Sequence, residues 1–99
     1  MKYQNYNKQN KEKDKKLITF FDEIEFLKKE NDIKKLYALY KKMNKESIED
    51  WLLKYQFLEA TNCNRKIKWI NEIYLELKIL SKNKSDIGRT VKRGLKLFQ

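Results

Sequence analysis

Two glutamates, Glu72 and Glu76, stand four residues apart and would lie one turn from each other on a helix. Two carboxylates at that spacing can share a metal ion. Lys68 stands one further turn before Glu72, however, and opposite charges at this spacing form ion pairs on helix surfaces. We therefore interpret this charged row as a solvated helix face.

The remaining residues offer little reactive chemistry. The sequence contains no histidine, which removes the usual base of serine and cysteine nucleophiles and the imidazole ligands of zinc. The one cysteine, Cys63, cannot form an intramolecular disulfide and stands in "TNCNRK", a composition typical of a loop. Gly88 and Gly94 do not form a phosphate-cradling loop. We predict a protein that is not an enzyme and that uses no metal and no cofactor.

Positive charge gathers at the two ends of the chain. The 99 residues carry a net charge of +10, of which residues 1–16 supply +4 and residues 82–99 supply +5. A surplus of cations favours an acidic partner such as nucleic acid. Codon drift in an AT-rich genome is the alternative explanation, because Lys, Asn, Ile and Tyr together make up 45 of the residues.

Apolar residues recur at helical spacing from Leu17 onward, and no segment alternates with the period of a strand. The sequence predicts an all-α fold, a compact bundle of four to five short helices. The expected helices cover about 17–30, 33–43, 48–60, 65–80 and 86–98. The expected N-caps are Asp32, Ser47, Asn64 and either Ser85 or Asp86. The helix at 65–80 is apolar nearly all round and is the most buried candidate, which favours a position in the centre of the bundle or at an interface.

Residues 1–15 are polar and rich in Lys, Asn and Gln. They bury too little apolar surface to offset their ordering entropy. We therefore expect a disordered basic N-terminal arm at 1–15 and a single helical-bundle domain at 16–99. The segment has no apolar core of a secretory signal, and no run of 18 apolar residues occurs, so we expect a cytoplasmic protein.

The closing stretch "DIGRTVKRGLKLFQ" separates its apolar and basic residues when wound as a helix. Ile87, Val91, Leu95 and Phe98 fall on one side, and four cations fall on the other. Clustered cations neutralise phosphates without histidine or metal. We predict that the protein binds a nucleic-acid backbone, DNA or RNA, as a subunit of a nucleoprotein assembly or a phage or mobile-element protein. The candidate contact residues are Lys82, Lys84, Arg89, Lys92, Arg93 and Lys96, extended by Arg65, Lys66 and Lys68.

A second hypothesis comes from the aromatic content of 13%. Aromatic residues are enriched at protein interfaces, so a small adaptor or inhibitor that docks on a larger protein through its helical surface is the alternative. An acidic protein surface, a homodimer or a place in a larger complex are variants of this hypothesis. Membrane binding is disfavoured, because the bundle needs the apolar side of the closing helix.

Overall fold

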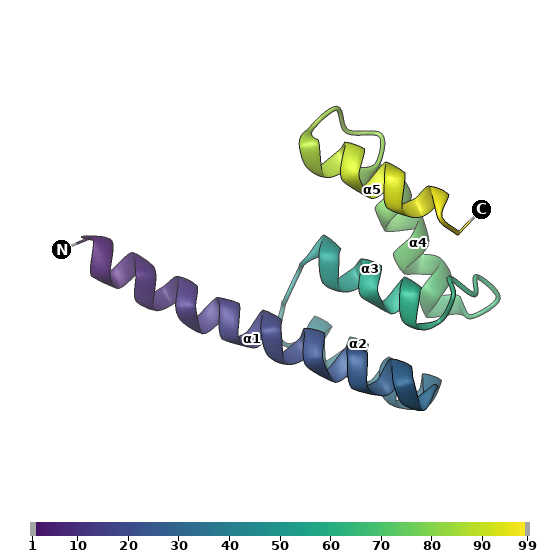
Figure 1. Ribbon diagram of the computed structural model, residues 1–99, viewed down its shortest axis with the longest axis horizontal. Helices are drawn as coiled ribbons and strands as arrows, with labels where there is room; N and C mark the ends of the chain where they lie inside the picture. Colours follow the sequence, from purple (N-terminus) through teal and green to yellow (C-terminus); the bar gives the residue numbers. More distant parts are fainter. Residues whose placement is uncertain (1, 99) are drawn as a thin grey trace.

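Five helices, and no strand, make up the part of the chain that the structure describes. This computed structural model describes residues 2–98, with side chains from Lys15 to Phe98. The helices are α1 (Lys2–Glu30), α2 (Ile33–Lys45), α3 (Trp51–Ala60), α4 (Lys68–Leu80) and α5 (Asp86–Lys96). α1 packs beside α2 and α3, and α4 packs between α3 and α5 (Figure 1). The predicted all-α bundle is confirmed.

The first half of α1 extends beyond the other helices (Figure 1). The sequence predicts a helix only from Leu17, whereas the helical backbone continues back to Lys2. Neither a proline nor a capping residue stops it, so the packed turns after Leu17 allow it to propagate toward the N-terminus. The side chains of residues 1–14 lie outside the described residues. An unpacked helix of this length is marginal in water, and disorder of the free arm stays a prediction.

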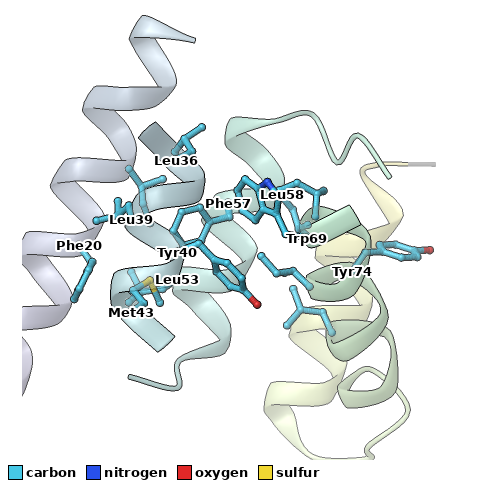
Figure 2. Packing of buried hydrophobic residues seen from close by; sticks show 14 of the residues in the cluster. Phe20, Leu36, Leu39, Tyr40, Met43, Leu53, Phe57, Leu58, Trp69 and Tyr74 are labelled. Atoms are coloured by element: carbon cyan, nitrogen blue, oxygen red, sulfur yellow. The ribbon is translucent and has the colours of Figure 1, made fainter. Parts of the chain in front are cut away.

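Trp69 of α4 lies in the middle of an aromatic cluster that links three helices (Figure 2). Its ring stacks on Tyr40 and Tyr37 of α2, with centroids 5.2 and 5.4 Å away, and meets Phe57 of α3 edge-on at 5.7 Å. Such pairs add about 0.5–1.5 kcal/mol each beyond the burial of their area. α1 contributes Phe20 to the same core. The other residues of the core are Ile24, Leu36, Leu39, Met43, Leu53, Leu58, Ile70, Ile73, Tyr74, Leu77, Val91 and Leu95.

The first three helices end in the same way, on a residue with left-handed backbone. These residues are Asn31 (φ 55°), Ser47 (φ 56°) and Asn62 (φ 52°). In each case the next amide along the chain donates to the helix carbonyl five residues earlier, as in a Schellman motif. Glycine favours this position and asparagine tolerates it. Ser47 is therefore the least suited of the three.

The helix that the sequence places at 48–60 begins instead at Trp51, with Asp50 as its N-cap. One carboxylate oxygen of Asp50 accepts from the amides of Leu52 and Leu53, at 2.9 and 3.0 Å. Ser47 was expected to be the cap, but it closes α2. An ionised carboxylate that accepts two amides is the stronger cap, and this sets the start of α3.

The fourth helix begins at Lys68, three residues later than expected. Asn64 does not cap it, because its side-chain oxygen accepts from the amide of Lys66 in the preceding turn. α4 has five buried residues, in keeping with its central position, but it is not buried on every side, since Leu75 is 51% exposed and Ile79 is 71% exposed. α3 and α5 cover two sides of α4, and a chain this small leaves the third side open.

Candidate nucleic-acid interface

The orientation of α5 decides where its cations lie. Ser85 caps the helix, as one of the two predicted caps, by accepting from the amide of Gly88 at 3.2 Å. Val91 and Leu95 are buried and Phe98 packs against the core, so this side of α5 faces inward as the sequence predicts, but Ile87 at the start of the helix is 45% exposed. The opposite, basic side is therefore turned to solvent.

Gly94 lets α5 approach α3 closely. A Cβ at this position would lie 2.7 Å from the ring of Tyr55, closer than packed atoms allow. The Tyr55 hydroxyl donates a hydrogen bond to the carbonyl of Gly94, at 3.1 Å. Gly88 passes the backbone of Asn83 in the same manner. Both glycines cost helix propensity, and close packing of α5 explains their use.

Six of the predicted contact residues belong to α5 and the turn that leads into it. All six are exposed, namely Lys82, Lys84, Arg89, Lys92, Arg93 and Lys96. Lys92 and Lys96 stand one turn apart and lie on the edge of α5 that faces α4.

A groove of about 130 Å³ runs between α4 and α5 at this edge. Its basic side chains are Lys78 from α4 with Lys92 and Lys96 from α5. Leu95 supplies apolar surface, and the hydroxyl groups of Tyr74 and Ser81 complete the lining. Three lysines from two helices thus line one small space.

Tyr74 lines the groove and also contacts a fourth cation outside it. Its ring is buried, yet it points away from the rest of the core cluster, with its hydroxyl outward (Figure 2). The guanidinium carbon of Arg65, in the turn before α4, lies over this ring at 4.6 Å from the centroid. The Lys78 ammonium donates to the Tyr74 hydroxyl at 3.5 Å. We call Tyr74 and the cations around it the Tyr74 cluster, which comprises Arg65, Tyr74, Lys78, Lys92 and Lys96.

No ion pair between the described side chains neutralises this cluster. Among residues 15–98, the ion pairs involve Lys35 with Glu30 and Asp32, and Lys54 with Glu76. Adjacent cations without a paired carboxylate leave a local positive potential, which attracts anions.

The structure brings only some of the predicted residues to the groove. Lys92 and Lys96 line it, whereas Arg65 lies outside it over the Tyr74 ring, and Arg89 and Arg93 are further along α5. Lys66 and Lys68 are exposed but do not line it. Lys68 is about 120° around the helix from Tyr74.

No protein-family model, curated protein or solved structure matches the chain. None of the helices in the described part of the chain has the length and apolar character needed to cross a membrane. The function is therefore inferred from the surface of the molecule.

Sequence reasoning missed Lys78. The one available signal was its position four residues after Tyr74, which puts both side chains on one face of α4. That face matters only because α5 packs along it, and a contact between two helices cannot be read from the spacing within one of them.

One of the two carboxylates of α4, that of Glu76, forms an ion pair with a lysine of α3. Glu76 pairs with Lys54 of α3 at 2.7 Å, and no ion pair joins Lys68 to Glu72 in the described residues. Burial lowers the pKa of Lys54, but the hydrogen bond and charge of Glu76, helped by Glu49 and Tyr40, outweigh it and raise the pKa above 10.5. Among the side chains that the structure describes, no three potential metal ligands gather.

Cys63 is half-buried in the turn after α3. Burial raises the pKa of its thiol above the ordinary 9.0, although the positive charge of Arg65 works in the opposite direction. The thiolate is the nucleophilic form, so Cys63 is a weak nucleophile at neutral pH.

Proposed function

We propose that the protein binds the phosphate backbone of a nucleic acid through the Tyr74 cluster, with Arg89 and Arg93 of α5 extending the contact. The observation that carries the proposal is the convergence of four cations, from three separate segments, on one groove and one tyrosine ring. Each cation that meets a phosphate releases condensed counterions, which drives association.

The size and lining of the groove suit a phosphate group. Its volume of about 130 Å³ has room for a few water-sized groups, since a water occupies about 30 Å³ in the liquid. Phosphate oxygens accept hydrogen bonds, and the three lysines offer donors that no carboxylate in the groove occupies. Arg89 and Arg93 of α5 are exposed near the groove, where they can contact further phosphates along the same strand.

Codon drift makes a different prediction about which lysines matter. Drift adds cations without regard to position, so removing any three exposed lysines should weaken association with a polyanion equally. Binding at the Tyr74 cluster requires particular lysines. Two charge-matched variants therefore separate the two explanations.

The first variant replaces Lys78, Lys92 and Lys96 by glutamine. The control replaces Lys28, Lys29 and Lys34, which are exposed on α1 and α2. Each variant lowers the net charge from +10 to +7. Fluorescence anisotropy with mixed-sequence duplex DNA, single-stranded DNA and RNA, at about 50 and 200 mM salt, measures the affinity and its salt dependence.

We expect the parent protein to bind in the micromolar range and to weaken roughly a hundredfold to a thousandfold between the two salt concentrations, as about four to six phosphate contacts require. The groove variant should lose most of this affinity, and its salt slope on duplex DNA should fall by about 2 to 3. The control should keep the parent slope. Equal losses in both variants, or a Kd of the parent weaker than about 100 μM at low salt for every probe, would overturn the proposal.

A specific observation also favours the alternative of a protein partner. Leu75 and Ile79 stand one turn apart on the open side of α4, and both are more than half exposed. An apolar pair on one helix face can serve as an anchor for a partner. Replacing both residues by glutamine should abolish such docking and leave nucleic-acid affinity unchanged. Pull-downs from lysate with the parent protein, the variant at Leu75 and Ile79, and the groove variant show which of the two surfaces a partner binds.

A further inference from the structure

Arg65 contributes a flat guanidinium group to the Tyr74 cluster as well as a positive charge. Its guanidinium lies over the Tyr74 ring, and this ring is itself fixed in the core. Arg65 is an exposed residue, so a ligand can reach its side chain from solvent. A planar cation held in place and reachable from solvent is a platform on which a flat ring can stack.

The groove stands next to this platform. Lys78 contacts the same tyrosine, through its hydroxyl, and lines the groove with Lys92 and Lys96. A nucleotide has a flat base and an anionic phosphate joined by a sugar, and the Tyr74 cluster offers a complement to each. Bases within a duplex are already stacked on one another and expose only their edges, so stacking on Arg65 requires an unpaired base.

We infer that the nucleic acid is bound as a single strand, with an unpaired base stacked on Arg65 and its phosphates at the lysines of the groove. This inference rests on the proposed function and specifies its substrate class. A stack of this kind tolerates every base, because each has a π-face, so binding is expected to show little sequence preference.

The decisive probe is an abasic strand. It keeps the phosphates and flexibility of a single strand but lacks the bases, and it is compared by anisotropy with the mixed-sequence strand of the same length and with its duplex. A stacked base contributes about 1–3 kcal/mol, and 1.4 kcal/mol corresponds to tenfold. The parent protein should therefore bind the base-containing strand about tenfold more tightly than the abasic one.

Arg65→Lys keeps the charge but removes the planar group, and Arg93→Lys makes the same change away from the ring. The Arg65→Lys variant should bind both strands with nearly equal affinity, and the Arg93→Lys variant should keep the difference. Because both side chains are exposed, circular dichroism should show both variants folded.

Equal affinity of the parent for the two strands would overturn the inference while leaving phosphate binding intact. Loss of the difference in both arginine variants, or tighter binding of the duplex at about 150 mM salt, would also overturn it. If no probe binds, the proposed function itself fails.

Discussion

The hydroxyl of Tyr55, in α3, donates a hydrogen bond to the backbone carbonyl of Gly94, in α5, over 3.1 Å. The ring of the same tyrosine lies 5.6 Å from that of Phe98, beyond the end of α5. This contact, together with the burial of Val91 and Leu95, fixes the basic side of α5 toward solvent. Its strength therefore determines how well the candidate interface is formed.

Gly94→Ala should destabilise the protein although alanine is the better helix former. Alanine gains about 1 kcal/mol in helix propensity, but its Cβ would overlap the Tyr55 ring, and overpacking costs about 1–3 kcal/mol. We expect a net loss of about 1 kcal/mol in urea unfolding. Thr90→Ala, at an exposed position of α5, is the control and should leave stability unchanged or slightly raised. A Gly94→Ala protein more stable than the parent would contradict the close packing of α5 on Tyr55.

The stability of the protein should fall at alkaline pH, in part through Tyr55. Burial raises the pKa of its hydroxyl above the ordinary 10.0, and negative charge at Glu59 and Cys63 adds to the rise. A pKa raised by folding gives stability that is complete below the unfolded value and is lost as pH rises through the folded value. The raised pKa of Lys54 acts with the same sign.

Thermal unfolding between pH 8 and 11 measures this loss. Stability contributed by Tyr55 should be constant up to about pH 10 and then decline. Tyr55→Phe removes the titrating group and the hydrogen bond, so it should be about 1 kcal/mol less stable at pH 8 and should decline less steeply above pH 10. Parallel profiles for the two proteins would show that Tyr55 does not titrate differently in the folded state.

Glu76→Gln should weaken the contact between α3 and α4. The side chain of Lys54 is only 13% exposed, and losing the carboxylate leaves its charge partly buried without a partner. Glu76 itself is half exposed, so solvent screens part of the effect and we expect a loss of about 1 kcal/mol. Lys54→Met replaces the charge by an apolar side chain and should be neutral or stabilising. Denaturant titration of both variants compares these outcomes, and a neutral Glu76→Gln would show that the ion pair contributes nothing.

Ser47→Gly should stabilise the end of α2. Ser47 has φ of 56°, a conformation that costs an ordinary residue about 1–2 kcal/mol and costs glycine almost nothing. The greater freedom of glycine in the unfolded chain offsets part of this gain, so we expect about 0.5–1 kcal/mol in urea unfolding. Ser85→Gly is the contrasting change, because Ser85 has negative φ and caps α5 with its hydroxyl. That variant should lose a few tenths of a kcal/mol.

The helices could be predicted from the sequence because the apolar spacing within each of them is a local property. The caps at Asp32 and Ser85 were predictable for the same reason, since each acts within its own turn. The prediction for Ser47 was wrong because a serine before an acidic residue suits the start of a helix as well as a turn. The choice between the two depended on Asp50, which takes the amides of the first turn.

The candidate site was less predictable than the fold. The exposed cations of α5 followed from its helical periodicity, and Arg65 was included as an extension of the same charge. The groove required knowing that α5 packs on the Tyr74 side of α4, and this in turn depended on the small size of Gly94 beside Tyr55. Interactions between helices, rather than within them, decide which cations meet.

The order of the helices in space has a consequence for how the chain folds. α4 packs against its neighbours along the chain, α3 and α5, whereas α1 must also meet α3, on the far side of α2 in sequence. Contacts between sequence neighbours form quickly, and closing the longer loop costs more entropy. During synthesis the apolar side of α1, with Phe20 and Ile24, is made well before its partner in α3 exists. The nascent chain therefore carries an apolar stripe next to its basic N-terminal segment, which α2 covers only in part, and the cover is complete only when α3 emerges from the ribosome.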